Sequence, residues 1–349
     1  MRVPEEQVVE PGAETYKRTR LNLEAISRLA EIADYSFAFA IRAVAAIGVA
    51  DHLIDGPRHI NDLAALTSCN PRGLLRVMRA LATKGIFAET SAETFALSPL
   101  ADLLRTDHPL SMRWFFRLEP DVQALAGLEY SVRTGQPAFD REYGMGYFDW
   151  MASHEYERNR FRESQRALNR LEILAISRSR PWREIDSVVD VGGNDGSLVS
   201  ELLKRSPSMV GTIFDLPETA ASAEETFRNA GVTDRATIVR GNVFEGDVPR
   251  GSRIYFMKRV LVGFSDAQAV TALSNVREAM APHSLLLIME PMGGATDQVG
   301  VSLDILMLVL GLGRMRTPEE FKQLLDKAGL KATGHRSLGL VTEVEAVPA

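Results

Sequence analysis

The chain is poor in cysteine, with a single one, Cys69, among 349 residues. One cysteine excludes an internal disulfide and every metal site built from several cysteines. The six histidines show no ligand spacing of the H-x-x-x-H kind, so no metal is predicted. No apolar run reaches the roughly 18 residues that a membrane span needs, and residues 1–6 lack a signal-peptide core. We therefore expect a cytoplasmic protein with no membrane partner.

Positive charge is also scarce, because 40 lysines and arginines stand against 46 aspartates and glutamates, for a net charge of -6. An acidic chain argues against a groove for nucleic acid, whose phosphates require a basic surface. With 45% hydrophobic and 25% charged residues, the composition is that of a globular protein long enough for two domains. A small-molecule substrate is therefore expected.

Glycine is missing from two positions where a dinucleotide site would need it. Residues 187–203 read SVVDVGGNDGSLVSELL, in which an apolar β-branched run leads into a turn and then into a helical period. A pyrophosphate loop G-x-G-x-x-G that began at Gly192 would need glycine at positions 194 and 197, which are Asn and Ser. What remains is an acid, Asp190, that ends the strand before Gly192 and Gly193. This pattern suits a ligand with a cationic ammonium and sulfonium, and it predicts S-adenosylmethionine.

A second acid, Asp215, ends the next apolar run about 20 residues past the loop. At that distance an acidic side chain meets the ribose hydroxyls of a bound nucleoside in such folds. A single aspartate at a strand end can also serve as a helix cap or a turn residue. The two aspartates in register favour the ribose interpretation.

The first part of the chain divides into an arm and a small domain. Residues 1–18 are polar, with prolines, and we expect a flexible arm there. Residues 19–105 begin with helical periodicity, and residues 37–47, FAFAIRAVAAI, have almost no polar face. A helix without a polar face must be buried, which predicts a homodimer partner for these N-terminal helices.

The rest of this domain has the outline of a winged helix, with two helices over residues 59–83 and a hairpin over residues 84–97. A winged helix would also fit a transcription regulator, whose recognition helix would carry four basic residues: Arg72, Arg76, Arg79 and Lys84. Arginines at helical spacing more often form a solvated face. The acidic chain and the cofactor crevice argue against the DNA-binding alternative.

The remaining residues predict linking helices and an α/β domain. Residues 106–182 contain two long helical patterns, 110–134 and 147–179, which we expect to cover the substrate pocket. Residues 183–349 alternate strand and helix, which predicts a Rossmann-like doubly wound sheet. The expected strands are 187–191, 210–214, 236–240, 253–257 and 284–289, and the expected helices begin at Ser197, Pro217, Asp266 and Thr317. The final alternation, residues 340–347, is expected to close an edge of the sheet.

Six motifs in order resemble a known family. They are DVGG at 190–193, FDLP at 214–217, RGNVF at 240–244, YFMKRVL at 255–261, LLIMEP at 286–291 and GRMRT at 313–317. The chain resembles small-molecule S-adenosylmethionine-dependent O-methyltransferases over about residues 20–349. That resemblance implies a class I methyltransferase domain, and a winged-helix domain that makes the dimer and does not bind DNA.

The resemblance also implies which residues hold the cofactor. It assigns the methionine end to Asp190, Gly192 and Gly193, and the ribose to Asp215 with Leu216. Asn242 stands where the family usually has an aspartate beside the adenine, and an amide oxygen can still accept from the adenine amino group. The other residues implied to contact the cofactor are Val243, Phe244, Met257 and Lys258, with Phe244 and Met257 flanking the adenine ring.

The catalytic positions depart from the family. Where the family reads L-H-D-W, this chain reads LVGF at residues 261–264, so Val262 stands at the position of the general base. The family's E-R-T is MRT here, and a carboxylate that orients the base has become Met315. Gln165 replaces a methionine, and only Glu290 matches a family catalytic carboxylate. Because valine cannot accept a proton, we expect a loss of about 10²–10⁴ in rate on a phenol.

Two interpretations fit this pattern. In the first, the protein methylates oxygen or carbon of a small aromatic or polyketide-type product that is already acidic or enolic, and Glu290, His154 or Gln165 orients the nucleophile. In the second, the protein keeps S-adenosylmethionine but does not transfer its methyl group. Some relatives of the family act in this way as hydroxylases, decarboxylases or pericyclases, using the charge of the cofactor and a closed pocket.

Overall fold

A computed structural model describes residues 22–115, 119–217, 222–292, 298–311 and 313–349. The predicted arm, residues 1–18, lies outside the described residues. The chain divides into two compact units, one ending at Asp102 and one beginning at Leu103. Each unit is described by itself.

The first unit combines helices with a small sheet. Its elements are α1 (Leu23–Ala33), α2 (Ser36–Ile47), η1 (Val49–Leu53), β1 (Arg58–His59), α3 (Ile60–Leu66), α4 (Pro71–Thr83), β2 (Phe87–Ser91), β3 (Thr94–Leu97) and α5 (Pro99–Asp102). The strands pair antiparallel in the order β1-β3-β2. The predicted cap of α4 is present, since the Asn70 side chain accepts a hydrogen bond from the backbone N–H of Gly73 at 3.0 Å.

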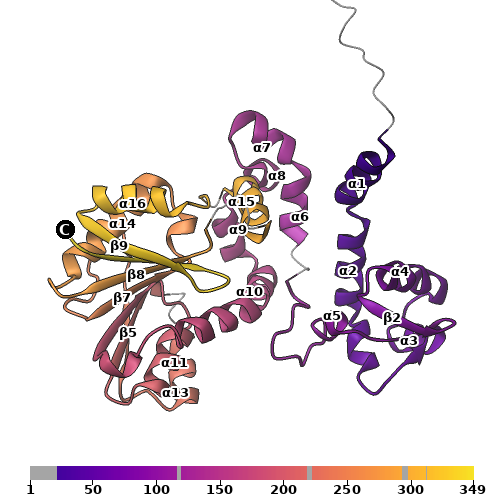
Figure 1. The fold of residues 1–349 in the computed structure, drawn as a ribbon, viewed down its shortest axis with the longest axis horizontal. Helices are drawn as coiled ribbons and strands as arrows, with labels where there is room; N and C mark the ends of the chain where they lie inside the picture. The colour runs from indigo at the N-terminus through magenta and orange to yellow at the C-terminus, as the bar shows by residue number, and fades with distance from the viewer. Residues whose placement is uncertain (1–21, 116–118, 218–221, 293–297, 312) are drawn as a thin grey trace, which may run out of the picture. The chain divides into compact units, whose positions relative to one another are not determined.

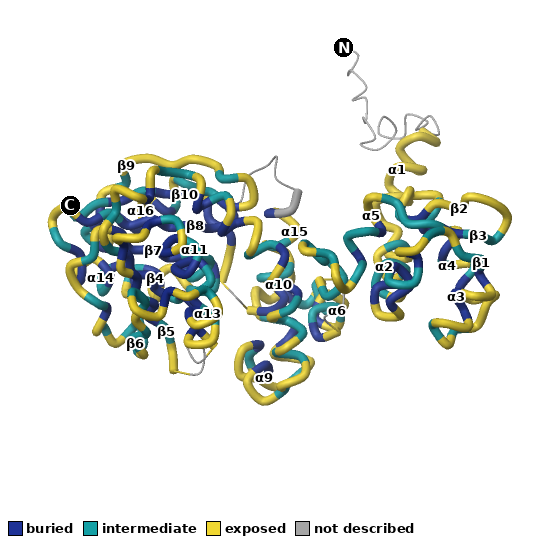
Figure 2. Tube along the Cα trace, turned by 90° about the horizontal axis from the view of Figure 1, so that it is seen from below, coloured by how far each residue is buried: buried dark blue, intermediate teal, exposed yellow. Residues whose placement is uncertain are grey.

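The apolar N-terminal helices are not buried within this chain. In α2 only Val44 and Ala45 are buried, although the segment was expected to be buried all round. Helix α1 buries nothing, and its four large apolar side chains are 54–68% exposed (Figure 2). These four are Leu23, Ile26, Leu29 and Ile32. Among the described residues of the first unit, therefore, this apolar stripe is uncovered.

The second unit is built on a seven-stranded sheet. Its strands are β4 (Ser187–Val191), β5 (Val210–Asp215), β6 (Ala236–Arg240), β7 (Ile254–Lys258), β8 (Leu285–Glu290), β9 (Leu330–Ser337) and β10 (Thr342–Pro348), in the order β6-β5-β4-β7-β8-β10-β9. The first five run parallel, which confirms the Rossmann-like sheet. Strand β10 is antiparallel to both β8 and β9. The expectation that the final strand forms an edge was wrong, because the unpredicted β9 occupies the edge and β10 lies inside it.

Helices cover both faces of the sheet. Figure 1 shows α14 (Asp266–Ala279) and α16 (Pro318–Lys327) on one face, and α11 (Ser197–Arg205) and α13 (Ala223–Ala230) on the other. Each face has its own buried cluster, one around Leu273 and Phe321 and one around Leu202 and Phe227. The start of the helix expected at Pro217 falls partly outside the described residues. Because parallel strands end at one edge of a sheet, Asp190, Asp215, Lys258 and Glu290 all lie at that edge.

The linking segment is more broken than the sequence predicted. Its elements are α6 (Glu119–Ala126), α7 (Leu128–Thr134), α8 (Ala138–Tyr143), α9 (Tyr147–Ser153), α10 (Glu155–Ile176) and η2 (Trp182–Glu184). The first predicted helix breaks at Gly127, where a Cβ would lie 2.7 Å from the Cβ of Ala138. The second breaks at His154, whose backbone leaves the helical region. The unpredicted α15 (Gln298–Leu310) packs with α6, α8 and α9 in one cluster.

The described residues contain neither a candidate membrane span nor a candidate metal site. None of the described helices has both the length and the hydropathy of a membrane span. No group of three or more His, Cys, Asp or Glu residues in the described part of the chain has the geometry of a metal site.

Candidate active site

The glycine loop after β4 is packed so tightly that two of its glycines have no room for a side chain. A Cβ on Gly192, which has a φ of +77°, would lie 2.5 Å from Cγ2 of Val260. A Cβ on Gly193 would lie 2.9 Å from Cγ2 of Ile213. The N–H of Gly192 donates to the carbonyl of Phe214 at 2.8 Å, which fixes the loop on β5. A side chain at Gly192 would therefore displace Val260, which follows β7, and a side chain at Gly193 would displace Ile213 of β5.

Asp215 is tied to this loop by its carboxylate. Oδ2 accepts from the N–H of Asn194 at 2.8 Å, and Oδ1 accepts from the N–H of Leu216 at 2.7 Å. Burial raises the pKa of Asp215, and these two N–H donors oppose the rise. Each oxygen keeps a lone pair for a further donor, and the side chain is only half-buried. Asp215 is thus placed to accept from two hydroxyls of a ribose.

Asp190 is a buried acid whose bonding is incomplete. It is 2% exposed, and its Oδ1 has no hydrogen-bond partner among the described residues. Burial raises the pKa of Asp190 to about 7, with Asp215 and Asp195 raising it further and Lys258 opposing them. A buried carboxylate without a partner is costly, and a cationic group beside it would remove that cost. The residues present therefore fit a ligand with an ammonium group.

Lys258, at the end of β7, is bound to helix α10. Its Nζ donates to Oδ1 of Asn169 at 2.7 Å and lies 3.4 Å from Oε2 of Glu172. Glu172 is fully buried and also accepts from Nε of Arg259 at 2.9 Å. The sequence did not predict Asn169 or Glu172, because they lie more than 80 residues before their partners.

The residues predicted to surround the adenine differ in their contacts and burial. Oδ1 of Asn242 accepts from the N–H of Phe244 at 3.0 Å, so the amide oxygen already has one donor. The Phe244 ring lies 4.8 Å from that of Phe264, and the Val243 carbonyl accepts from a side chain of α14. Met257 was expected to flank the adenine, but it is fully buried in the core of the sheet. Its side chain has no free surface in this structure, because inward positions of a central strand face the covering helices.

Glu290 is hydrogen-bonded to the turn that contains Val262. Its Oε1 accepts from the N–H of Leu261 at 2.7 Å and from the N–H of Val262 at 3.3 Å. Its Oε2 is buried and has no partner among the described residues. Burial raises the pKa of Glu290 to about 7, against the hydrogen bond from Val262 and the charge of Arg259. Val262 itself is 7% exposed and contributes an isopropyl group at the position where the resemblance implied an imidazole.

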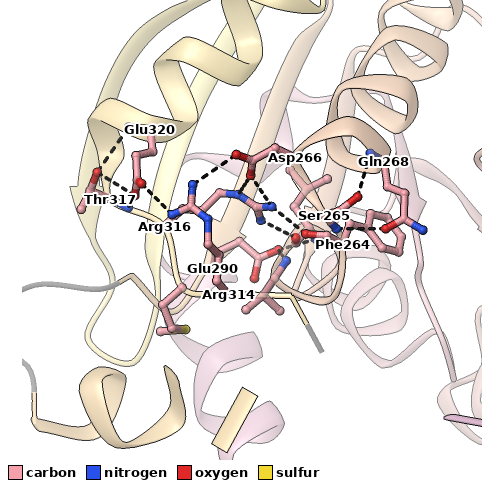
Figure 3. A network of polar contacts seen from close by, with 12 residues as sticks. Phe264, Ser265, Asp266, Gln268, Glu290, Arg314, Arg316, Thr317 and Glu320 are labelled. Carbon is pink, nitrogen blue, oxygen red and sulfur yellow. Dashed lines mark hydrogen bonds and ion pairs between the residues drawn. The ribbon is translucent and has the colours of Figure 1, made fainter. Parts of the chain in front are cut away.

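A buried arginine joins this turn, η3 (Leu261–Gly263), to the loop that carries Met315. Arg316 is 1% exposed and donates to the carbonyls of Leu261 and Phe264, each at 2.6 Å (Figure 3). Its Nε donates to Oδ1 of Asp266 at 3.0 Å. The N–H of Met315 donates to Oδ1 of Asp304 in α15 at 2.7 Å. The structure thus brings the Val262 and Met315 segments together as the resemblance implied.

Two of the predicted site residues have local partners instead. His154 stacks on Trp150, with ring centroids 3.8 Å apart, and its Nδ1 lies 2.8 Å from the Trp150 carbonyl oxygen. Gln165 donates from Nε2 to Oγ of its neighbour Ser164 at 3.2 Å. Neither side chain contacts Glu290 or Val262 in the described structure, so the prediction that one of them orients the nucleophile has no geometric support here.

Comparison with known proteins decides the family. Residues 126–331 match the O-methyltransferase domain, and residues 30–107 match the O-methyltransferase dimerisation domain. The chain belongs to the O-methyltransferase family. The resemblance inferred from the six motifs is confirmed, and so is the N-terminal position of the dimerisation domain.

The relatives of this chain include proteins named as methyltransferases and one named as a hydroxylase. An 8-amino-8-demethylriboflavin N,N-dimethyltransferase of Streptomyces davaonensis is 36% identical over 318 residues, which are 89% of this chain and 91% of that protein. A phenazine O-methyltransferase of Lysobacter antibioticus is 34% identical over 302 residues, 85% and 88% of the two chains. An aclacinomycin 10-hydroxylase of Streptomyces purpurascens is 29% identical over 313 residues, 87% and 83% of the two chains.

A solved relative supports the cofactor. An O-methyltransferase from neocarzinostatin biosynthesis, in complex with S-adenosylmethionine and 2-hydroxy-5-methyl naphthoic acid, matches with a TM-score of 0.80 and 28% identity, over 92% of this chain and 98% of that chain. Together with the family match, it confirms S-adenosylmethionine as the cofactor of this O-methyltransferase. The crevice that contains Asp190 and Asp215 has the chemistry this cofactor needs.

Besides Asn169 and Glu172, the sequence did not indicate three polar residues around the turn that contains Val262: Asp266, Asp304 and Arg316. For Asp304 a signal was present, because it is the only charged residue in α15, QVGVSLDILMLVL. A lone charge in an apolar helix suggests a specific partner. Arg316 gave no such signal, since its burial depends on carbonyls more than 50 residues earlier.

Proposed function

We propose that this chain transfers a methyl group from S-adenosylmethionine to a small aromatic or polyketide-type natural product, without a side-chain base at position 262. The observation that carries the proposal is the contrast between two parts of one site. The residues assigned to the cofactor include the acids Asp190 and Asp215 and the glycines of the loop. In contrast, Val262, at the position of the base, and Met315, at the position of the carboxylate that orients it, are both apolar. The residues for binding S-adenosylmethionine are therefore present, but no imidazole is available at position 262 to deprotonate the acceptor.

On the cofactor side, we assign the ammonium group to the unsatisfied carboxylate of Asp190 and the ribose hydroxyls to Asp215. The backbone at Gly192 and Gly193 would lie against the methionine part. When bound, S-adenosylmethionine supplies a methyl group on a positively charged sulfur, which is a strong electrophile. The protein's own part is to hold the acceptor atom in line with that methyl group, and orientation of this kind can lower a barrier by about 7–11 kcal/mol.

On the acceptor side, the apolar residue at position 262 favours nucleophiles that need no side-chain base to remove a proton before they react. An acidic hydroxyl is already ionised, and an enol carbon or an aromatic amine attacks while still protonated, whereas an ordinary phenol with a pKa near 10 is mostly un-ionised. An amine attacks through its lone pair and loses its proton afterwards. The relative at 36% identity, whose name is that of an N,N-dimethyltransferase, supports the inclusion of amines.

The test is direct turnover. The purified protein is incubated with S-adenosylmethionine and each of two probes, 8-amino-8-demethylriboflavin as an aromatic amine and 2-hydroxy-5-methyl naphthoic acid as a phenol. Mass spectrometry should show a gain of one or two methyl groups, and a larger rate on the amine. If neither probe nor a wider panel of aromatic amines and acidic phenols gains a methyl group, while the cofactor binds, the proposal fails.

In a second candidate function, the protein binds S-adenosylmethionine but does not transfer its methyl group. It is favoured by the hydroxylase relative at 29% identity and by the loss of both proton-handling side chains. In this alternative the sulfonium charge and the closed pocket stabilise a reacting anion, and the cofactor is recovered unchanged. A product formed while S-adenosylmethionine stays intact would establish the alternative and overturn the methyl-transfer proposal.

We also propose that the first unit, with α3, α4 and the hairpin β2–β3 in a winged-helix outline, forms a homodimer. The exposed apolar stripe of α1 and the match to a dimerisation domain support this assembly. Residues 106–182 are proposed to cover the substrate pocket. A cytoplasmic location stays a prediction from the sequence.

A further inference from the structure

Helix α15 presents an apolar stripe that contains one carboxylate. Val301, Ile305 and Leu308 are 46%, 41% and 37% exposed, and they are spaced so that they share one face of the helix. Asp304 is also exposed and belongs to the same face. The opposite face, with Leu306, Val309 and Leu310, packs against the helices α6, α8 and α9.

Hydrogen bonds connect helix α15 to η3, the turn that contains Val262. Oδ1 of Asp304 accepts from the N–H of Met315 at 2.7 Å. The next residue, Arg316, holds the carbonyl of Leu261, whose N–H is bound by Glu290. The carboxylate of Asp304 therefore lies beside the backbone of Met315. Met315 stands at the position where the resemblance implied a carboxylate.

The carboxylates of Glu290 and Asp304 differ in their exposure to solvent. Glu290 is fully buried, and both of its short contacts are to backbone N–H groups. Asp304 is exposed, and among the described residues only its Oδ1 has a recorded partner. Of these two carboxylates, therefore, only that of Asp304 is open to a molecule that lies on the apolar stripe.

We propose that Asp304 binds the acceptor, taking a hydrogen bond on Oδ2 from the N–H or O–H of the atom to be methylated, while the acceptor's flat apolar ring lies on Val301, Ile305 and Leu308. The inference rests on the proposed methyl transfer and names the residue that handles the acceptor's proton. As the bond from that atom to the methyl carbon forms and the carbon–sulfur bond breaks, the proton passes to Oδ2 and then to water. Charge balances, because the sulfonium charge is lost as the proton is released.

The ligand class follows from this geometry. An apolar helix face with one carboxylate selects a planar ring system that bears a hydrogen-bond donor, and it disfavours the ionised hydroxyl that the proposed function alone would allow. Aromatic amines and neutral enols meet the requirement. A carboxylate adjacent to the reacting atom would be disfavoured.

The test uses Asp304→Asn, which keeps an oxygen for the N–H of Met315 and removes only the charge and the basic site. On whichever probe the wild type methylates, kcat should fall by about 10²–10⁴, because an amide oxygen cannot take the proton of the acceptor. The affinity for S-adenosylmethionine should not change. Asp326→Asn, which removes the same charge from an exposed site on α16, is the matched control and should retain wild-type kcat.

A second variant tests the stripe without touching the carboxylate. Ile305→Ala should raise KM for the acceptor several-fold and leave the oligomeric state unchanged. Wild-type kcat in Asp304→Asn, or a change of oligomeric state with unaltered KM in Ile305→Ala, would overturn the inference and leave methyl transfer intact. A wild-type protein that methylates no acceptor would instead contradict the proposed function, and this inference with it.

Discussion

Gly313 lies directly against Val262. Its φ is +74°, and a Cβ at this position would collide with the carbonyl oxygen of Val262 and with the backbone that follows it. The loop that carries Met315 and the turn that carries Val262 therefore meet backbone to backbone. This contact places Val262 and Met315 in one site, although they are more than 50 residues apart in the sequence.

Substitution of Gly313 should separate the two segments. Gly313→Ala is expected to lower the free energy of unfolding by at least about 1–2 kcal/mol from the left-handed backbone alone, and to reduce turnover more than its stability loss implies. Gly263→Ala is the matched control, because a Cβ there meets nothing within 4 Å, and it should change stability by less than about 0.5 kcal/mol. Equal behaviour of the two variants in denaturant titrations would contradict the contact.

Arg316 should matter far more than its neighbour Arg314. Arg316→Met leaves the buried carbonyl of Leu261 without a donor, at a cost of about 1–3 kcal/mol in stability. Arg314 is 44% exposed and pairs with Glu320 and Asp266, so Arg314→Met should cost within about 1 kcal/mol. Chemical denaturation of both variants measures the difference, and a larger loss for Arg314→Met would refute the role given to the buried guanidinium.

The strands and the cofactor loop could be predicted from the sequence because their signals are local. Residues 187–203 carry both the apolar run and the glycines, and Asp215 ends a run of its own. The missed features depend on distant partners: Gly127 breaks a helical pattern because Ala138 packs against it, and β9 reaches the edge only by pairing with β10. The partners of Lys258 lie on a helix more than 80 residues away, and no short-range pattern indicates them.

Asp215 should contribute directly to cofactor affinity. Asp215→Ala is expected to weaken S-adenosylmethionine binding by about 1.5–3 kcal/mol, since hydrogen bonds from the ribose to a charged acceptor are lost. Part of the loss comes from the N–H of Asn194, which would lose its partner. Titration calorimetry measures the effect, with Asp234→Ala at an exposed position as control. Equal affinities for the two variants would mean that the ribose binds elsewhere.

Glu290 should make stability depend on pH. Its pKa is raised from 4.5 to about 7 in the folded protein, so the folded state holds the proton more tightly than the unfolded state does. The contribution to stability is complete below pH 4.5 and is lost as the pH rises toward 7. Glu290→Gln keeps an oxygen for the N–H of Leu261 and should flatten this dependence. Unfolding titrations between pH 4.5 and 8 test it, and an unchanged slope in the variant would assign the dependence to another group, such as Asp190.

Restoring the imidazole should restore phenol chemistry. Val262→His would place a base beside Glu290, whose Oε2 has no partner among the described residues, and it should raise methylation of a weakly acidic phenol by up to about 10²–10⁴. Methylation of an aromatic amine should change little. Val262→Phe adds similar bulk without a proton acceptor and should show no gain. A gain in both variants would mean that the size of residue 262, and not its basicity, limits the reaction.

The central claim is that a methyl group leaves S-adenosylmethionine although position 262 offers no base. The wild-type protein is therefore supplied with S-adenosylmethionine that carries a trideuterated methyl group, together with an aromatic amine, and both products are measured by mass spectrometry. The account predicts trideuteromethyl on the amine nitrogen, and one S-adenosylhomocysteine for each group transferred. Conversion of the acceptor without the label, with the labelled cofactor recovered intact, would contradict it.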